Sequence, residues 1–313
     1  MSELALGVDI GGTNIEYGLV DRKGNLIYHF IKPTNSFPTA EEFIHFINQD
    51  STIKSHYKSI TGIGIGAPNG NYFSGTIDFA PNLHWKGVIP LRQISQSILQ
   101  LPTILTNDAN AAAVGEKIFG VAKDLSDFVT ITLGTGLGSG VFCNNQIVYG
   151  AHGIAGEYGH VRVIPNGRSC KCGRFGCLES YASSTGILRS YHELESPNKG
   201  SSLLNTLSTI TAKDIFHFAQ NQDVYALELV NYTADILGSA LADFACFSDP
   251  KAYILFGGIA QSGEFFREKV AEIMNAQLIL PLKNKIEVRV SGLHTKNAAI
   301  LGNAAIVFHE IKN

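Results

Sequence analysis

Charge of either sign is sparse in this 313-residue chain, where 24 Lys and Arg stand against 27 Asp and Glu for a net charge of −3. Without a basic excess, the sequence predicts no nucleic-acid partner and no anionic membrane partner. No apolar run approaches the ~20 residues that a bilayer-spanning helix needs. The first residues run directly into a strand-like pattern with no cleavable leader, which predicts a cytoplasmic protein with reduced thiols.

The short motifs of two large nucleotide-binding classes are also missing. The sequence has no G-x-x-x-x-G-K-[ST] motif and none of the H-R-D and D-F-G motifs of protein kinases. The stretch GIGIGA at residues 62–67 fits a dinucleotide-binding turn by spacing. We reject that interpretation, because Pro68, Asn69 and Gly70 follow where the fold requires a helix.

A pattern of strand, glycine turn and strand occurs twice, in LALGVDIGGTNIEYGLVD and again in FVTITLGTGLGSGVFC. The two copies start roughly 120 residues apart, which indicates two related α/β halves. We predict two lobes with a ligand cleft between them. One lobe comprises residues 1–115 plus 299–313, and the other comprises residues 116–298.

Glycine-rich turns follow three apolar strands, in DIGGTN (9–14), LGTGLGSG (133–140) and FGGIA (256–260). Glycine allows a positive φ and lets backbone N–H groups approach a phosphate. Tight hairpin turns without a ligand are the alternative. Asp9 beside the first turn either holds Mg²⁺ or caps the turn. The candidate nucleotide-binding residues are Asp9, Gly11, Gly12, Thr13, Gly134, Thr135, Gly136, Gly257 and Gly258.

Asn107 and Asp108 stand between a strand end and an alanine-rich helical segment in TNDANAAAVGE. Both residue types are good helix N-caps. A carboxylate at a helix N-terminus is also held in its ionised form, which a general base in phosphoryl transfer needs. The residues alone leave cap and base open.

Further polar residues could bind the vicinal hydroxyls of a sugar with paired hydrogen bonds. They are Asn82 in APNLHW, Glu157 and His160 in GEYGH, and Glu179 in GCLESY. Taken singly, each is as well explained as a surface or structural residue.

Three of the five cysteines fall in CKCGRFGCLE, residues 170–179. With His160, the thiols of Cys170, Cys172 and Cys177 make a tetrahedral zinc set with no position left for water, which predicts a structural site. Redox chemistry by the close pair and a disulfide are the alternatives, the latter disfavoured in a reducing compartment.

DIGGTN, TNDANAAA, LGTGLGSG, GEYGHVRV and CKCGRFGCLESYAS occur in the order found in the ROK family of sugar kinases and transcriptional repressors, which this chain resembles over nearly its whole length. The resemblance implies an actin-like fold, which is shared by sugar kinases and the Hsp70 ATPase. This fold is of the ribonuclease H-like type. The resemblance also implies ATP, Mg²⁺, structural Zn²⁺, a hexose substrate and a homodimer.

By motif position, the resemblance implies that Asp108 is the catalytic base and also touches the sugar. Asn107, Glu157, His160 and Glu179 look like the other sugar contacts, and His160 with the three cysteines looks like the zinc site. CLESYASSTGI resembles the glucokinase members most, so we expect phosphorylation of glucose. Kinases for N-acetylmannosamine, N-acetylglucosamine, allose or fructose, and a silent sugar sensor, are the alternatives.

Two details bear on that choice. The repressor branch carries a helix-turn-helix before its kinase-like region, whereas this sequence begins at the first glycine-turn strand, which favours a kinase. Asn69 and Asn71 replace residues that the family often has after the GIGIGA-type strand, on a loop expected near the sugar. The sequence of that loop therefore does not indicate which sugar is the substrate.

Overall fold

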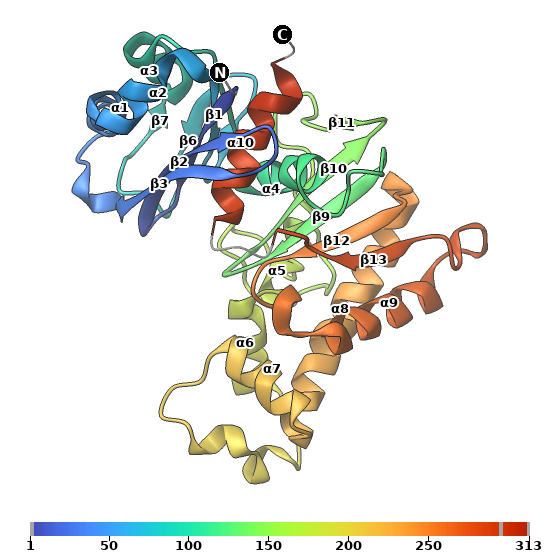
Figure 1. The fold of residues 1–313 in the computed structure, drawn as a ribbon. Helices are drawn as coiled ribbons and strands as arrows, with labels where there is room; N and C mark the ends of the chain where they lie inside the picture. Colours follow the sequence, from blue (N-terminus) through green and yellow to red (C-terminus); the bar gives the residue numbers. More distant parts are fainter. Residues whose placement is uncertain (1–2, 294–296, 312–313) are drawn as a thin grey trace. The chain divides into compact units, whose positions relative to one another are not determined.

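A computed structural model describes residues 3–293 and 297–311 of the chain (Figure 1). The chain forms two compact units, each described here by itself. Unit 1 is built from residues 1–124, 147–155 and 292–313, and unit 2 from residues 125–146 and 156–291, each within the described part. The lobes predicted from the sequence stay a prediction, and their residues 1, 2, 294–296, 312 and 313 lie outside the described residues.

The main sheet of unit 1 has five strands in the order β3-β2-β1-β4-β8. Its first three strands form an antiparallel meander, and β4 and β8 are then added in parallel. Asp21 makes the tight turn after β2, because its Oδ1 accepts the N–H groups of Lys23 and Asn25. The strands are β1 (Leu4–Ile10), β2 (Asn14–Asp21), β3 (Leu26–Pro33), β4 (Ile60–Gly66) and β8 (Thr103–Thr106).

The sheet of unit 2 repeats that topology in the order β11-β10-β9-β12-β13. Strands β9 and β10 are antiparallel, and β12 and β13 are added in parallel. Asn144 and Asn145 both have positive φ, as a two-residue hairpin turn requires. The shared strand order confirms the internal repeat. The strands are β9 (Phe128–Leu133), β10 (Leu137–Cys143), β11 (Gln146–Ile147), β12 (Ala252–Phe256) and β13 (Glu287–Val290).

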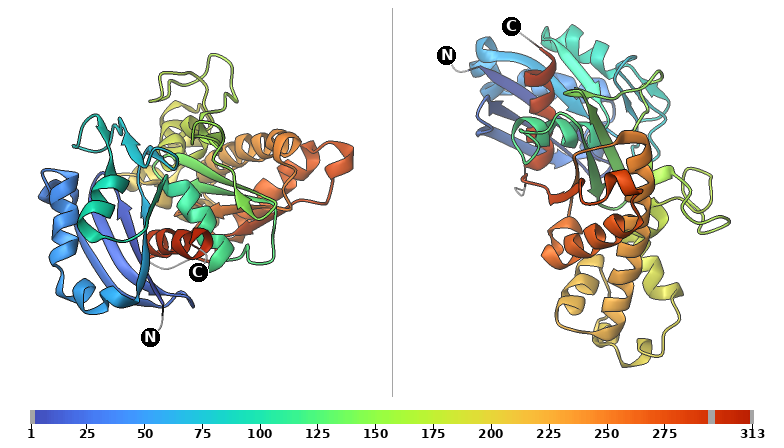
Figure 2. Two further views of the ribbon diagram at one scale, coloured as in Figure 1. Left: turned by 90° about the horizontal axis from the view of Figure 1, so that it is seen from above. Right: turned by 90° about the vertical axis from the view of Figure 1, so that its right-hand side faces the viewer.

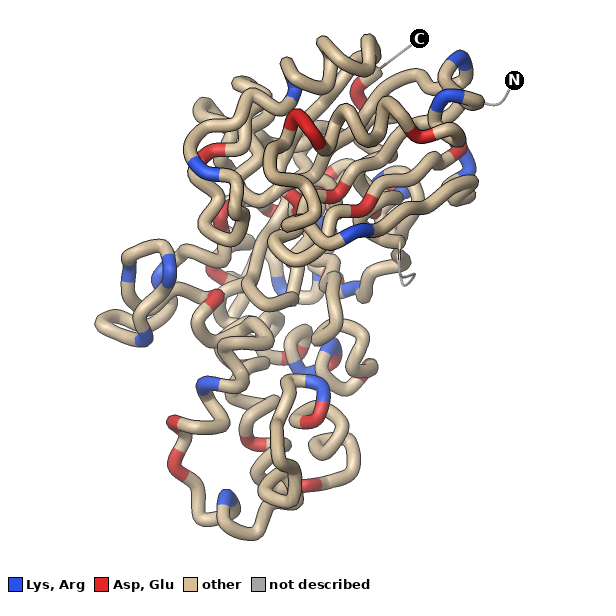
Figure 3. The backbone as a smooth tube through the Cα atoms, turned by 90° about the vertical axis from the view of Figure 1, so that its left-hand side faces the viewer, with Lys and Arg blue, Asp and Glu red and all other residues tan. Residues whose placement is uncertain are grey.

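Helices and a small sheet complete the two units. Unit 1 has α1 (Ala40–Gln49), α2 (Ser51–His56), α3 (Leu91–Leu99), α4 (Asp108–Ile118), α10 (Ala298–Glu310) and the sheet β5 (Gly70–Asn71), β6 (Thr76–Asp78) and β7 (Val88–Ile89). Unit 2 has α5 (Glu179–Ala182), α6 (Ser184–Glu193), α7 (Ala212–Gln220), α8 (Val224–Ser248) and α9 (Glu264–Gln277). Acidic and basic residues are interspersed along the chain (Figure 3).

Glycines on one face of the first sheet let α10 lie directly against it (Figure 2). A Cβ at Gly64 would stand 1.8 Å from the carbonyl oxygen of Asn303, and one at Gly7 would stand 2.4 Å from that of Ile300. The alternating glycines of GIGIGA therefore serve helix–sheet packing, which agrees with our rejection of a dinucleotide site there. This packing also brings the side chain of Asn303 to the end of β1.

Candidate active site and metal cluster

The first glycine turn leaves β1 at Asp9 and returns as β2. Gly11 N–H donates to the carbonyl oxygen of Asn14 over 2.9 Å, which closes the turn. A Cβ at Gly12 would lie 2.6 Å from the carbonyl oxygen of Asn82, so the structure brings the Asn82 loop against this turn. Thr13 and Asn82 are exposed.

The carboxyl of Asp9 lies among other acids. Burial, followed by the charges of Asp108 and Glu16, raises the pKa of Asp9 to about 7, and Asn303 opposes this shift. The side chain of Asn303 is buried and lies beside this carboxyl. A divalent cation would relieve the repulsion between these carboxylates, so the residues present fit a Mg²⁺ ion.

The two residues at the start of α4 have different roles, which the sequence alone did not assign. Asn107 is the N-cap, with its Oδ1 accepting the N–H of Asn110 over 2.7 Å. Asp108 is the first helical residue and is exposed, and its Oδ1 accepts the N–H of Ala109 over 2.9 Å. Although the residue is exposed at the protein surface, the surrounding protein partly desolvates its carboxyl, which raises the pKa of Asp108, while that hydrogen bond opposes the change. Because Asn107 caps the helix, Asp108 stays available to a substrate.

In unit 2 the second and third glycine turns lie together. A Cβ at Gly257 would stand 2.6 Å from the carbonyl oxygen of Leu133, where the second turn begins. Cβ atoms at Gly134 and Gly258 would meet none of the described residues within 4 Å, so both backbones face space that a ligand can enter. This suits a nucleotide, with Thr135 exposed between the glycines of its turn.

Our reason for these glycines needs a correction. Among the predicted nucleotide-binding glycines that the structure describes, Gly257 has a positive φ of 102°, whereas Gly11, Gly12, Gly134 and Gly136 do not. At Gly11, Gly12 and Gly136 glycine is needed for a different reason, because a Cβ atom would lie within 3.0 Å of a neighbouring atom. At Gly136, for example, a Cβ would lie 2.3 Å from Oε2 of Glu179, so this glycine makes room for a side chain of unit 2.

The predicted metal ligands come together within unit 2. One ligand atom from each of His160, Cys170, Cys172 and Cys177 lies within 4.8 Å of all the others. Sγ of Cys172 and Sγ of Cys177 are 3.7 Å apart, and Sγ of Cys170 is 3.6 Å from Nδ1 of His160. A tetrahedron with Zn–S bonds near 2.3 Å has S–S edges of about 3.8 Å. The cluster therefore has the donor set and the dimensions of a zinc site.

A small hairpin shapes this cluster. Residues Ser169 and Phe175 form an isolated bridge, and Gly173 N–H donates to the carbonyl oxygen of Cys170 over 3.0 Å. Burial first, and then hydrogen bonds that its thiol donates to the sulfurs of Cys172 and Cys170, raise the pKa of Cys177 to about 12. A metal cation favours the thiolate form that such a site otherwise resists.

Three predicted sugar contacts of unit 2 lie beside the same hairpin. His160 points Nδ1 at Cys170, and its Nε2 lies 3.9 Å from Oε2 of Glu157. Glu179 starts α5, with Oε1 3.7 Å from Sγ of Cys170. The three therefore gather at one edge of the cluster. Asn82, Asn107 and Asp108 belong to unit 1.

The loop that departs from the family pattern proves to be structural. Asn69, with φ of 53°, donates from Nδ2 to the carbonyl oxygen of Asp78 over 2.9 Å. Asn71 accepts the N–H groups of Phe73 and Ser74 and donates to the carbonyl oxygen of His152. Both carboxamides are thus engaged in shaping unit 1.

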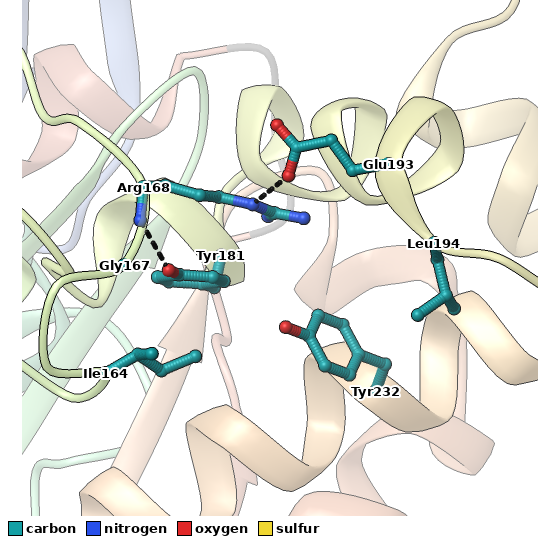
Figure 4. Close-up of a pocket in the computed structure, with 7 residues that line it drawn as sticks. All are labelled: Ile164, Gly167, Arg168, Tyr181, Glu193, Leu194 and Tyr232. Atoms are coloured by element: carbon teal, nitrogen blue, oxygen red, sulfur yellow. Dashed lines mark hydrogen bonds and ion pairs between the residues drawn. The ribbon is translucent and has the colours of Figure 1, made fainter.

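Arg168 is a residue that our sequence reasoning missed. Its guanidinium donates to the carbonyl oxygens of Ser180 and Gly186. It also pairs with Glu193 at 2.7 Å and lies over the ring of Tyr181 (Figure 4). It thereby joins the cysteine hairpin to α5 and α6. An arginine in a loop carries no sequence signal of such partners, because they belong to two other segments, α5 and α6.

Two five-stranded mixed sheets of one topology define a mixed α/β protein of the actin-like class. Among solved structures, the fold is similar to that of a ROK family glucokinase from Streptomyces griseus in complex with glucose and AMPPNP. That match has a TM-score of 0.79 and 34% identity, and it covers 97% of this chain and 98% of that one. No helix in the described ranges combines the length and hydropathy needed to cross a membrane.

Sequence comparisons agree with that class. The chain is 34% identical over 312 residues to a glucokinase of Halalkalibacterium halodurans, covering 96% of this chain and 94% of that protein. It is 33% identical over 314 residues to a xylose repressor of Caldicellulosiruptor bescii, covering 98% and 78% respectively. The model of the ROK family matches residues 5–310. The chain belongs to the ROK family.

Proposed function

We propose that this protein is an ATP-dependent hexose kinase that converts glucose to glucose 6-phosphate. Asp108 carries the proposal. It is an exposed carboxylate at the first position of α4, released from capping by Asn107 and placed near Asp9. A solved relative with 34% identity was obtained in complex with glucose and AMPPNP, which supports both ligand classes.

In this proposal Asp108 accepts the proton of the sugar 6-hydroxyl as that oxygen attacks the γ-phosphorus in line. Asn82, Asn107, Glu157, His160 and Glu179 bind the sugar hydroxyls.

The nucleotide is assigned to the backbone of the three glycine turns. Gly11, Gly12 and Thr13 with Gly134, Thr135 and Gly136 would contact the phosphates, and Gly257 and Gly258 would flank the adenosine. Asp9 would hold Mg²⁺, which neutralises phosphate charge when bound. Zinc held by His160 and the three cysteines would fix His160 and Glu179. A cytoplasmic homodimer stays a prediction.

A sugar sensor without turnover is a second candidate, because a xylose repressor is 33% identical to this chain, close to the 34% of a glucokinase. A coupled assay of ADP release distinguishes the kinase from the sensor. The sugars offered as substrates, one at a time, are glucose, fructose, allose, N-acetylmannosamine, N-acetylglucosamine and xylose. We expect the highest kcat/KM with glucose. Sugar binding by calorimetry without turnover of any sugar would overturn the kinase proposal in favour of the sensor.

A further inference from the structure

The turn between β9 and β10 is held from one side by the segment that follows the cysteines. The carbonyl oxygen of Gly134 accepts both the N–H of Ser184 at 2.9 Å and its Oγ–H at 2.8 Å. The carbonyl oxygen of Thr135 accepts the hydroxyl of Thr185 at 2.8 Å. Leu137 N–H donates to Oε2 of Glu179 over 3.1 Å.

The direction of these bonds determines where the turn's amides point. In a trans peptide the carbonyl oxygen of one residue and the N–H of the next point in opposite directions. Because the carbonyls of Gly134 and Thr135 point at the start of α6, the N–H groups of Thr135 and Gly136 point away from it. Two successive N–H groups on the exposed side of a glycine turn are suited to an anion.

The segment that holds the turn is itself rigid. Ser183 caps α6 by accepting the N–H of Gly186 at 3.0 Å, and it donates to the carbonyl oxygen of Glu179 at 2.7 Å. A Cβ at Gly186 would lie 2.6 Å from the backbone of Tyr181, so α5 and α6 meet in a close corner. Arg168 ties this corner to the cysteine hairpin through Ser180 and Gly186.

We propose that Ser184 and Thr185 are positioning residues, which hold the 134–137 turn with its amides directed at the nucleotide phosphates. The cysteine hairpin, α5 and the first turn of α6 then act as one support for the turn. The inference rests on the kinase proposal. It assigns nucleotide affinity, rather than sugar affinity, to two hydroxyls that would touch neither substrate.

Three variants and two controls test it. Thr185→Val and Ser184→Ala remove one hydroxyl donor each, and the double variant removes both. Thr185→Ser keeps the donor. Thr206→Val is the matched control, because within the described part of the chain its hydroxyl bonds only in its own exposed turn, to the carbonyl oxygen of Leu203 at 2.7 Å. Binding of AMPPNP with Mg²⁺ and of glucose is measured separately by calorimetry, and zinc content is measured for every variant.

We expect the Kd for AMPPNP to rise about threefold for each single variant and about tenfold for the double variant, because exposed hydrogen bonds contribute modestly. Thr185→Ser and Thr206→Val should stay within about twofold of wild type. The glucose Kd and the zinc content should not change. An unchanged AMPPNP Kd in the double variant would overturn the inference, as would equal weakening of glucose binding.

A separate readout distinguishes this inference from the kinase proposal. Amide hydrogen exchange over residues 133–138 should accelerate in the double variant with no nucleotide present. If the wild-type protein bound no AMPPNP, the kinase proposal would fail, and the exchange rates would still report on the positioning role. Unchanged exchange in the double variant would show that Ser184 and Thr185 do not hold the turn.

Discussion

Glu179 accepts a hydrogen bond from the backbone amide of Leu137, 3.1 Å away, and so links α5 to the end of the second glycine turn. Its other carboxylate oxygen lies 3.7 Å from Sγ of Cys170. A single side chain therefore contacts both the predicted zinc site and the predicted phosphate turn.

Replacing Glu179 by Ala should consequently raise the KM for ATP as well as that for glucose, each about tenfold, since one lost charged hydrogen bond costs 1–3 kcal/mol. Glu157→Ala is the matched control, because its carboxylate lies by His160 and should affect the sugar alone. Steady-state kinetics with each substrate varied measures both. An ATP KM unchanged by Glu179→Ala would refute the link.

The Asp108→Asn variant should lose about 10²–10⁴ in kcat, since the carboxamide cannot take the proton of the attacking hydroxyl. Glucose and AMPPNP should still bind, because Asn107 supplies the cap of α4. Glu41→Gln, at an exposed acid in the first turn of α1, should keep the wild-type rate. A wild-type kcat in Asp108→Asn would exclude this carboxylate as the base.

The acid cluster at Asp9 should cost stability as the pH rises. The pKa of Asp9 is 3.8 in the unfolded chain and about 7 in the folded protein. Between pH 3.8 and 7 the unfolded state has therefore released a proton that the folded state keeps, so the free energy of unfolding falls as the pH rises. Without Mg²⁺, Asp9→Asn should therefore be more stable than wild type at about pH 8, by on the order of 2–4 kcal/mol, and closer to it at about pH 5.

Urea unfolding at the two pH values checks this expectation. Addition of Mg²⁺ should stabilise the wild-type protein and leave Asp9→Asn unaffected, because the variant lacks the carboxylate. A variant less stable than wild type at the higher pH would contradict the electrostatic account of this cluster.

Gly64→Ala should destabilise unit 1 by about 3 kcal/mol or more, because the new methyl group would overlap the carbonyl oxygen of Asn303 on α10. Gly200→Ala is the matched control, since a Cβ there meets no atom of residues 3–293 or 297–311 within 4 Å and its φ is not positive. Chemical denaturation of the two variants measures the difference. Equal stabilities would show that α10 does not lie directly on the sheet.

Metal analysis of freshly purified protein should find about one zinc per chain. Removal of the metal should lower the melting temperature and weaken glucose binding, because His160 and Glu179 lose their common support. The exposed Cys143 and Cys246 are outside the cluster, so a Cys143→Ser, Cys246→Ser double variant should keep its zinc. Protein that is purified without zinc and still binds glucose would contradict the metal assignment.

Local sequence determined the elements and the metal cluster. The hairpins at residues 21–25 and 144–145 follow from Asp, Asn and Gly, whose side chains or φ preferences shape the turn without help from elsewhere. The four metal ligands lie within eighteen positions of one another, so a short chain segment can bring them together. The repeated strand and glycine-turn pattern likewise predicted two related α/β halves, and the two sheets share one strand order.

Only the tertiary structure decided what most of the glycines and several polar residues do. Gly64 makes room for α10 and Gly136 for Glu179, and these neighbours are far away in the sequence. Asn303, Arg168, Ser184 and Thr185 acquire their roles from partners on other segments. A sequence pattern encodes local propensity and spacing, whereas the direction of a carbonyl and the space beside a Cα are fixed when distant segments pack.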